Sequence, residues 1–121
     1  MLLPLLFLVT IAAQDVTDGD TFRTPTGEKI RISNIDTPEK GSRAKCDAER
    51  FLAVHARAGL VALLGQGPAE ITPEPVQNDP WKRTLARVRV RGLDVGDALV
   101  NQALAVKWAG RRHNWCAPIP G

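Results

Sequence analysis

Residues 82–91, KRTLARVRVR, carry the clearest secondary-structure signal in the chain and indicate a sheet protein. Small apolar residues alternate with arginines here: Ala86, Val88 and Val90 against Arg87, Arg89 and Arg91. A period of two predicts a strand with one apolar face and one basic face. The basic face either follows a nucleic-acid backbone or is simply solvated. The preceding stretch, 69–76, contains two prolines and suits a sheet edge better than its centre.

Two further strand-like stretches, residues 16–24 and 28–35, flank a Pro-Thr-Gly turn. In the second stretch Arg31 stands between Ile30 and Ile32. Because alternate side chains of a strand point to opposite faces, we expect Arg31 to project away from the isoleucines and to lie outside the core.

Two segments have a helical period instead. Residues 47–64 and, more briefly, 95–104 place apolar side chains three or four positions apart. The residues expected to face the core are Phe51, Val54, Ala58, Val61 and Leu64 in the first segment and Val95, Leu99 and Ala103 in the second. Asp47 is the expected N-cap, and Gly65 ends the first helix. Strands dominate, so the predicted class is mainly β or α+β, a small curved sheet or barrel with packed helices.

Length and charge restrict the function further. A chain of 121 residues is a single domain, and its 44% hydrophobic and 24% charged residues exclude disorder as the main state. Residues 1–79 have 8 Lys and Arg against 11 Asp and Glu, whereas residues 80–121 have 8 against 2. An acidic part and a basic part can hold a cation and an anion together, which is typical of a polyphosphate partner.

The N-terminal residues 1–13 are treated separately from the domain at 14–121. Residues 2–13 are almost entirely apolar but too short to span a bilayer. They have the length of a signal-peptide core and end in small residues, but they lack a basic start. They are therefore either a signal peptide or anchor, or a first strand over 8–13.

Cys46 and Cys116 lie 70 positions apart, which excludes a CxxC redox pair and a four-cysteine zinc site. Either they form one disulfide, which requires an oxidising compartment, or they are two unrelated thiols. The disulfide and the apolar start together favour a secreted or periplasmic protein.

Three polar clusters carry candidate chemistry: DGDT at 18–21, DTPE at 36–39, and Lys82-Arg83. Each alone is typical of an ordinary turn or strand end. Together they supply three carboxylates and, with the arginine at 31, two guanidinium groups. Carboxylates suit a divalent cation and guanidinium binds phosphate bidentately, so the set contains the groups needed to hydrolyse a phosphodiester.

The ordered set DGDT, Arg31, DTPE and Arg83 resembles the staphylococcal-type thermonuclease family, from about residue 15 to residue 107. The resemblance implies a five-stranded OB-fold barrel with two packed helices. It also implies calcium-dependent hydrolysis of DNA and RNA.

The same resemblance implies a role for each matching residue. Calcium would be bound by the carboxylates of Asp20 and Asp36 and by the main-chain carbonyl of Thr37. Arg31 and Arg83 would hold the reacting phosphate. Glu39 would be the general base.

The chain departs from the family pattern in its aromatic residues, because it contains no tyrosine. Trp81 either stacks on a base or packs as a core or rim residue, and Trp108 is expected in the core. Lys82, beside Trp81, is a second candidate for substrate binding. The long third helix of the family type is expected to be replaced by the tail.

Three hypotheses follow. The first is a monomeric calcium-dependent nuclease that acts on DNA and RNA, with no stable protein partner and no membrane span. The second is a noncatalytic OB-fold module that binds nucleic acid. The third is a structural or interaction domain in which the carboxylates serve only as turns.

Overall fold

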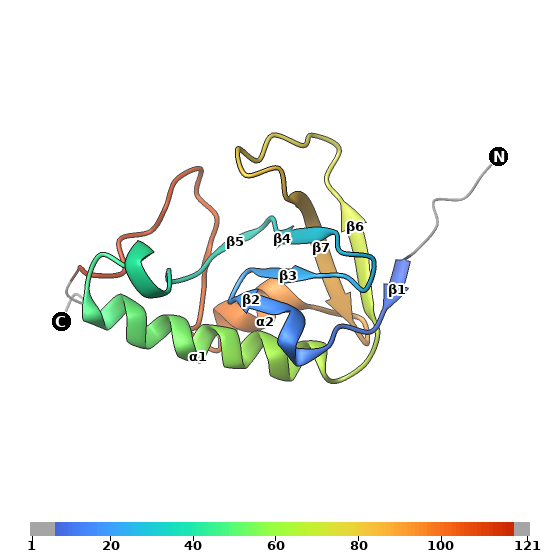
Figure 1. Ribbon diagram of the computed structural model, residues 1–121, viewed down its shortest axis with the longest axis horizontal. Helices are drawn as coiled ribbons and strands as arrows, with labels where there is room; N and C mark the ends of the chain where they lie inside the picture. Colours follow the sequence, from blue (N-terminus) through green and yellow to red (C-terminus); the bar gives the residue numbers. More distant parts are fainter. Residues whose placement is uncertain (1–6, 118–121) are drawn as a thin grey trace.

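The computed structural model describes residues 7–117, which form a curved sheet flanked by two helices (Figure 1). In the first half of the chain, the strands are β1 (Phe7–Val9), β2 (Val16–Asp18), β3 (Thr21–Arg23), β4 (Lys29–Ile32) and β5 (Ile35–Asp36). Helix α1 (Asp47–Leu64) follows. The second half contains β6 (Ala69–Pro73), β7 (Thr84–Val90), β8 (Leu93–Asp94), α2 (Val95–Asn101) and β9 (Val106–Lys107).

The main sheet has the strand order β1-β6-β7-β4-β3-β2, with β8 paired to β7. Strands β4 and β7 run parallel, and the other pairs in this sheet are antiparallel. The short strands β5 and β9 form a separate pair. The prediction of a mixed α+β, OB-like sheet with two helices is therefore confirmed, although the path runs openly from β1 to β2 and the barrel is not closed.

One face of the sheet forms the core together with both helices. The largest fully buried apolar side chains are Phe22, Ile30, Ile32, Ile35, Leu60, Leu64, Val88, Val95 and Leu99. The alternation predicted for β7 is confirmed, because Ala86, Val88 and Val90 are buried while Arg87 and Arg89 are exposed.

Helix α1 has the predicted length, and its predicted core face is confirmed at the C-terminal end, where Leu64 is buried and Val61 packs against the core. It is wrong earlier in the helix, because Phe51 and Val54 are 66% and 67% exposed. There the buried face is built on small residues in the middle of the helix, Ala53 and Ala56. Small side chains let the helix approach the β2–β3 turn closely, which larger ones would prevent.

The first turn of α1 also differs from the prediction. Cys46, rather than Asp47, is the N-cap, and its Sγ accepts a hydrogen bond from the Glu49 backbone N–H at 3.4 Å. The predicted end at Gly65 is confirmed. Cys46 is also bonded to Cys116, which confirms the disulfide interpretation and ties the C-terminal segment to the start of α1. Since disulfides persist in oxidising compartments, this bond indicates a location outside the cytoplasm.

Three smaller expectations are corrected. The stretch 16–24 is broken into β2 and β3 by the turn at 18–21. Strand β6 lies between β1 and β7 rather than at an edge, because β1 covers it over Ala69–Ile71. Ala103 lies beyond the end of α2, with a φ of 60°.

The described part of the N-terminal segment packs on the domain. Strand β1 pairs with β6, and Ile11 is 5% exposed within the core. The interpretation of residues 1–13 as a signal peptide or anchor stays a prediction. Within residues 7–117, no helix is both long and apolar enough to cross a bilayer.

Candidate functional site

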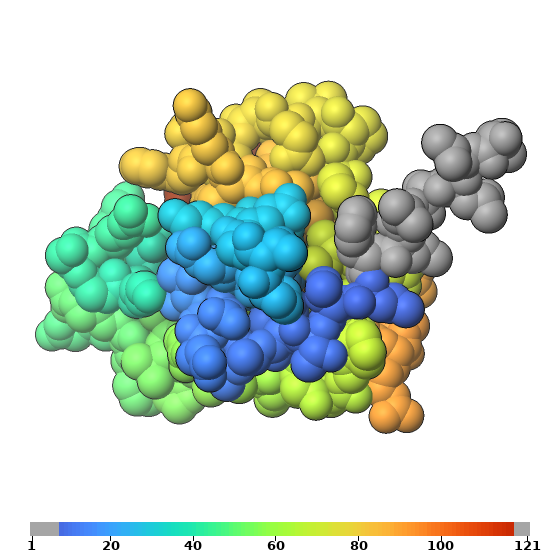
Figure 2. All heavy atoms as spheres, turned by 45° about the vertical axis from the view of Figure 1, so that its right-hand side comes forward, coloured from blue at the N-terminus to red at the C-terminus, as the bar shows by residue number. Residues whose placement is uncertain are grey.

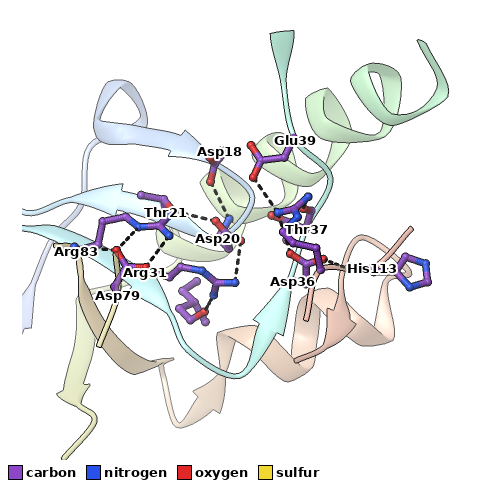
Figure 3. A network of polar contacts seen from close by, with 12 residues as sticks. Asp18, Asp20, Thr21, Arg31, Asp36, Thr37, Glu39, Asp79, Arg83 and His113 are labelled. Carbon is purple, nitrogen blue, oxygen red and sulfur yellow. Dashed lines mark hydrogen bonds and ion pairs between the residues drawn. The ribbon is translucent and has the colours of Figure 1, made fainter. Parts of the chain in front are cut away.

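A polar cavity of about 490 Å³ opens at one end of the sheet. Four charged residues predicted from the sequence line it, Asp20, Arg31, Glu39 and Arg83, together with the stacking candidate Trp81. Figure 3 shows Asp20 between the two arginines on one side and the segment of Asp36, Thr37 and Glu39 on the other. Residues that are distant in sequence thus converge on one hollow.

The backbone of the turn between β2 and β3 packs closely against α1 at Gly19. A side chain at Gly19 would place its Cβ 2.7 Å from the Cβ of Ala56 and 3.0 Å from that of Thr37. Only glycine permits this approach without a shift of the backbone or helix. The turn therefore stands next to the DTPE segment because residue 19 has no side chain.

Parallel pairing of β4 and β7 places both predicted arginines at the cavity. Arg31 is paired in register with Leu85, two residues after Arg83. The Arg31 Nη2 lies 3.5 Å from Asp20 Oδ2, and the Arg83 Nη1 donates to Thr21 Oγ1 at 3.2 Å. The expectation that Arg31 lies outside the apolar core is confirmed, because it leaves the sheet on the face opposite the buried isoleucines and lines the cavity. It is nevertheless only 8% exposed, because this face of the sheet is the wall of the cavity rather than open surface.

Asp79, which the sequence analysis did not select, fixes the Arg83 guanidinium. Its two carboxylate oxygens accept from Arg83 Nε at 3.0 Å and from Arg83 Nη2 at 2.9 Å. Its Oδ2 also accepts from the backbone N–H groups of Trp81 and Arg83. Hydrogen bonding from Arg83 keeps the pKa of Asp79 below its usual value. The only signal in the sequence was the spacing of four residues between an aspartate and an arginine around a proline turn.

The DTPE segment is held from α1. Asp36 and Thr37 are buried, at 0% and 2% exposure. Glu49, in the first turn of α1, accepts from the Glu39 backbone N–H at 2.9 Å and from the Lys45 N–H at 2.8 Å. This buried carboxylate was also missed, and it orients the backbone on which the Glu39 side chain is carried.

A third arginine reaches this segment from the C-terminal tail. The Arg112 Nη1 lies 3.0 Å from Asp36 Oδ1 and 2.8 Å from Glu39 Oε1, and its Nη2 lies 3.4 Å from Glu49 Oε2. The Nη2 also donates to the Thr37 carbonyl at 3.4 Å. No periodicity or motif in the tail distinguished Arg112 from the adjacent Arg111.

The pKa values of the two carboxylates in the DGDT turn are shifted in opposite directions. Burial, followed by the nearby charge of Asp20, raises the pKa of Asp18 from 3.8 to about 7. Burial also acts to raise the pKa of Asp20, but the Arg31 charge and hydrogen bonds from Asp18 and Thr21 outweigh it, so this pKa is lowered. At neutral pH Asp20 is thus the charged member of the pair, and Asp18 stands near its midpoint.

Both tryptophans stand at the cavity rather than in the core. Trp81 and Trp108 are 65% and 43% exposed, and both line the cavity, so the core expectation for Trp108 is wrong. The Trp108 ring lies 5.4 Å from the Arg31 guanidinium, and the Trp81 ring 5.2 Å from that of Arg43. In Figure 2 the residues near position 80, in gold, project above those near position 40, in teal. Two partly exposed aromatic rings at a polar cavity suit base stacking.

Lys82 does not share this hollow. It lines a neighbouring depression with Gln77, Asp79 and Thr84, and its φ is 59°. The positive φ belongs to the tight turn that starts at Asp79, whose carbonyl accepts from the Lys82 N–H at 3.0 Å. Within the described residues, Lys82 therefore shapes the turn that presents Trp81 and Arg83.

The oxygen donors at the site suit a hard divalent cation in chemistry. Within residues 7–117, no three His, Cys, Asp or Glu side chains gather closely enough to form a metal cluster by themselves. However, Asp36 Oδ1 is buried and accepts no hydrogen bond from the described residues, while a guanidinium charge stands 3.0 Å away. A buried carboxylate and a backbone carbonyl that already attract one cation are the ligand types that calcium prefers. The residues present thus fit such an ion.

Comparison with known proteins defines the class. Residues 29–115 match the family of staphylococcal nuclease homologues, so the chain belongs to that family. The matched range contains Arg31, the DTPE segment and Arg83, and the DGDT turn precedes it. No curated protein matches the chain. Members of this family are typically metal-dependent, and the domain is a nuclease or nucleic-acid-binding module.

Proposed function

We propose that this protein is a calcium-dependent nuclease that hydrolyses phosphodiester bonds of DNA and RNA. The observation that carries the proposal is the convergence of Asp20, Arg31, Glu39 and Arg83 on one cavity. A noncatalytic module needs a basic surface, but it does not need a carboxylate facing two oriented guanidinium groups.

The arginines provide the phosphate site. Each guanidinium is a planar fork that matches two phosphate oxygens, and each is held by a carboxylate, Arg31 near Asp20 and Arg83 on Asp79. Fixed donors favour the extra negative charge that develops on the phosphoryl oxygens in the transition state, because no reorganisation is needed when the charge appears.

Glu39 is the general base of the proposal. Its carboxylate lines the cavity, and its backbone is oriented by Glu49. From this position it accepts a proton from the attacking water. Asp20, Asp36 and the Thr37 carbonyl would hold calcium, which when bound supplies positive charge to the phosphate and lowers the pKa of bound water. The exposed faces of Trp81 and Trp108 would stack against bases on either side of the reacting phosphate.

The second candidate is an OB-type module that binds single strands without cutting them. The Arg112 contacts favour it, because a guanidinium already neutralises the acidic segment that the calcium proposal requires. The two functions differ in what the arginine at 83 does. Its removal costs a binder modest affinity, whereas it costs a nuclease most of its turnover.

The test is a digestion of single-stranded DNA and RNA with calcium, magnesium or a chelator in parallel. Cleavage is expected with calcium and is expected to disappear in the chelator. The Arg83→Ala variant should lose cleavage, and Arg23→Ala, an exposed arginine outside the cavity, should retain it. Strand binding without cleavage in calcium would select the module instead.

The proposal includes a secreted or periplasmic location, which the disulfide and the apolar N-terminal residues support. Determination of the N-terminal residue of the protein isolated from culture medium or periplasm tests it.

A further inference from the structure

The C-terminal tail places a positive charge on the oxygens that the proposed calcium site needs. We propose that Arg112 is an internal cation that holds the acidic segment in the absence of metal and competes with the divalent ion for Asp36 and the Thr37 carbonyl. The inference rests on the proposed metal site, but it concerns a residue that the phosphodiester chemistry does not use.

The contacts of Arg112 are those of a cation in a ligand set rather than of a surface ion pair. Its guanidinium faces three carboxylates, of Asp36, Glu39 and Glu49, with side chains 1%, 26% and 4% exposed. It also donates to a backbone carbonyl, that of Thr37. Three carboxylates brought this close repel one another unless positive charge lies between them. Arg112 supplies that charge.

The tail is fastened at two points after this contact. The His113 backbone N–H donates to Asp36 Oδ2 at 2.8 Å, while the His113 imidazole points away from the site (Figure 3). Three residues further on, Cys116 is bonded to Cys46, one residue before α1 and three residues before Glu49. The disulfide therefore limits how far the guanidinium can move from the acidic segment.

Competition follows from the shared atoms. Two cations cannot both occupy Asp36 Oδ1 and the Thr37 carbonyl, because their mutual repulsion adds to the loss of ligands. Metal binding thus requires Arg112 to leave. When only a fraction of the molecules is in the binding-competent state, the apparent dissociation constant rises by the reciprocal of that fraction. The Arg112 side chain is 41% exposed, so solvent partly screens its ion pairs, and we expect its effect on calcium affinity to be modest.

The neighbouring Arg111 provides a matched control. It carries the same charge one position earlier in the tail, is exposed, and within the described residues it makes no ion pair or hydrogen bond. If the charge of the tail alone decided calcium affinity, replacing either arginine would change it equally. If Arg112 competes for the site, only its replacement should change calcium affinity.

The experiment is a calorimetric titration of the oxidised full chain with calcium chloride alone, without nucleic acid. Wild type, Arg112→Ala, Arg112→Gln and Arg111→Ala are compared. We expect both Arg112 variants to bind calcium about three- to tenfold more tightly than wild type, as removal of partly exposed ion pairs allows. Arg111→Ala should bind like wild type. An equal or weaker affinity in the Arg112 variants, the same gain in Arg111→Ala, or no calcium binding by any variant would each overturn the inference.

Thermal melting should show opposite effects of Arg112→Ala without and with calcium, which distinguishes competition for the site from a nonspecific change in stability. In chelator, Arg112→Ala should melt below wild type because the carboxylates have lost their counterion. In calcium it should show the larger rise in melting temperature, because a tighter ligand stabilises the native state more.

The role of the disulfide is tested in the same titration. The double variant Cys46→Ser and Cys116→Ser keeps an N-cap oxygen on α1 and releases the tail. Calcium affinity should rise in this background, and adding Arg112→Ala to it should give little further gain. Full additivity of the two changes would show that the disulfide does not hold Arg112 in place. Because none of these measurements uses a substrate, failure of the inference is separate from failure of the digestion assay.

Discussion

Asp18→Asn is expected to stabilise the protein at alkaline pH and to leave it unchanged in acid. Burial and the adjacent Asp20 charge raise the Asp18 pKa from 3.8 to about 7, so ionisation of this carboxyl costs the folded state free energy. At about 1.4 kcal/mol per pH unit, the rise bounds the cost at about 4 kcal/mol. Asparagine has no charge to lose, and it preserves an oxygen that can accept from the Asp20 backbone N–H, as Asp18 Oδ1 does at 3.2 Å.

The sign follows from proton uptake. Below pH 3.8 Asp18 is protonated in both states and imposes no cost. Between 3.8 and about 7 the folded state holds a proton that the unfolded state has released, so stability falls as the pH rises. Above about 7 the full cost is present. The stability difference between Asp18→Asn and wild type should therefore grow from near zero at pH 4 to its maximum near pH 8.

Urea unfolding in chelator at several pH values measures this difference. The matched control is Asp15→Asn, another acidic residue in the same N-terminal region that lies outside the turn. A difference that stays constant with pH, or a variant less stable than wild type at pH 8, would refute the reasoning about burial and Asp20.

Three further predictions concern two residues that shape the site and the N-terminal strand. Asp79→Asn should destabilise the fold by about 1–2 kcal/mol and weaken nucleotide binding, because Arg83 loses a charged partner at a partly screened position. Since the pKa of Asp79 is lowered in the folded state, this stabilisation is present at pH 7 and disappears as the pH falls below about 4. Urea unfolding of the variant and wild type at both pH values checks this expectation. Gly19→Ala should cost about 1–3 kcal/mol and most activity, because the added Cβ would meet Ala56 at 2.7 Å; normal melting and cleavage would contradict the close approach. A chain that begins at residue 14 should lose about 2 kcal/mol or more, because Ile11 leaves the core and β1 leaves β6; an unchanged melting temperature would show that these residues are dispensable.

Strands with strong alternation and the site residues near them were predictable from sequence. The pattern of β7 specifies its faces by itself, and the ordered acidic and basic clusters indicate one candidate site because each lies at an end of a strand. The core face of α1 was not predictable in this way. Large apolar residues dominate a prediction made from periodicity, but the buried face of the helix includes the small residues Ala53 and Ala56, and Ala56 lies against the turn at Gly19. The need for small side chains at these positions arises only from the packing of the helix on the turn.

The residues that orient the site were missed for a related reason. Asp79, Glu49 and Arg112 act through contacts with partners whose positions depend on the folded chain, and Arg112 lies 73 positions from Glu39. Their residue types are common in surface turns and helix ends, so only spatial proximity identifies them. Trp108 was misplaced because a tryptophan suits a core as well as a stacking surface, and the sequence does not show which neighbours surround it.

The parallel alignment of β4 with β7 makes the backbone separation of Arg31 and Arg83, the two arginines proposed to bind phosphate, a property of the main chain. Adjacent strands lie about 4.8 Å apart, so this spacing is set by peptide geometry rather than by side-chain fit. Repacking the apolar interior with residues of different shape should therefore alter thermal resistance long before it alters the width of the anion clamp. By contrast, an insertion of a single residue into β4 would reverse the facing of the residues after it, which would disturb the clamp and the buried isoleucines of this strand together.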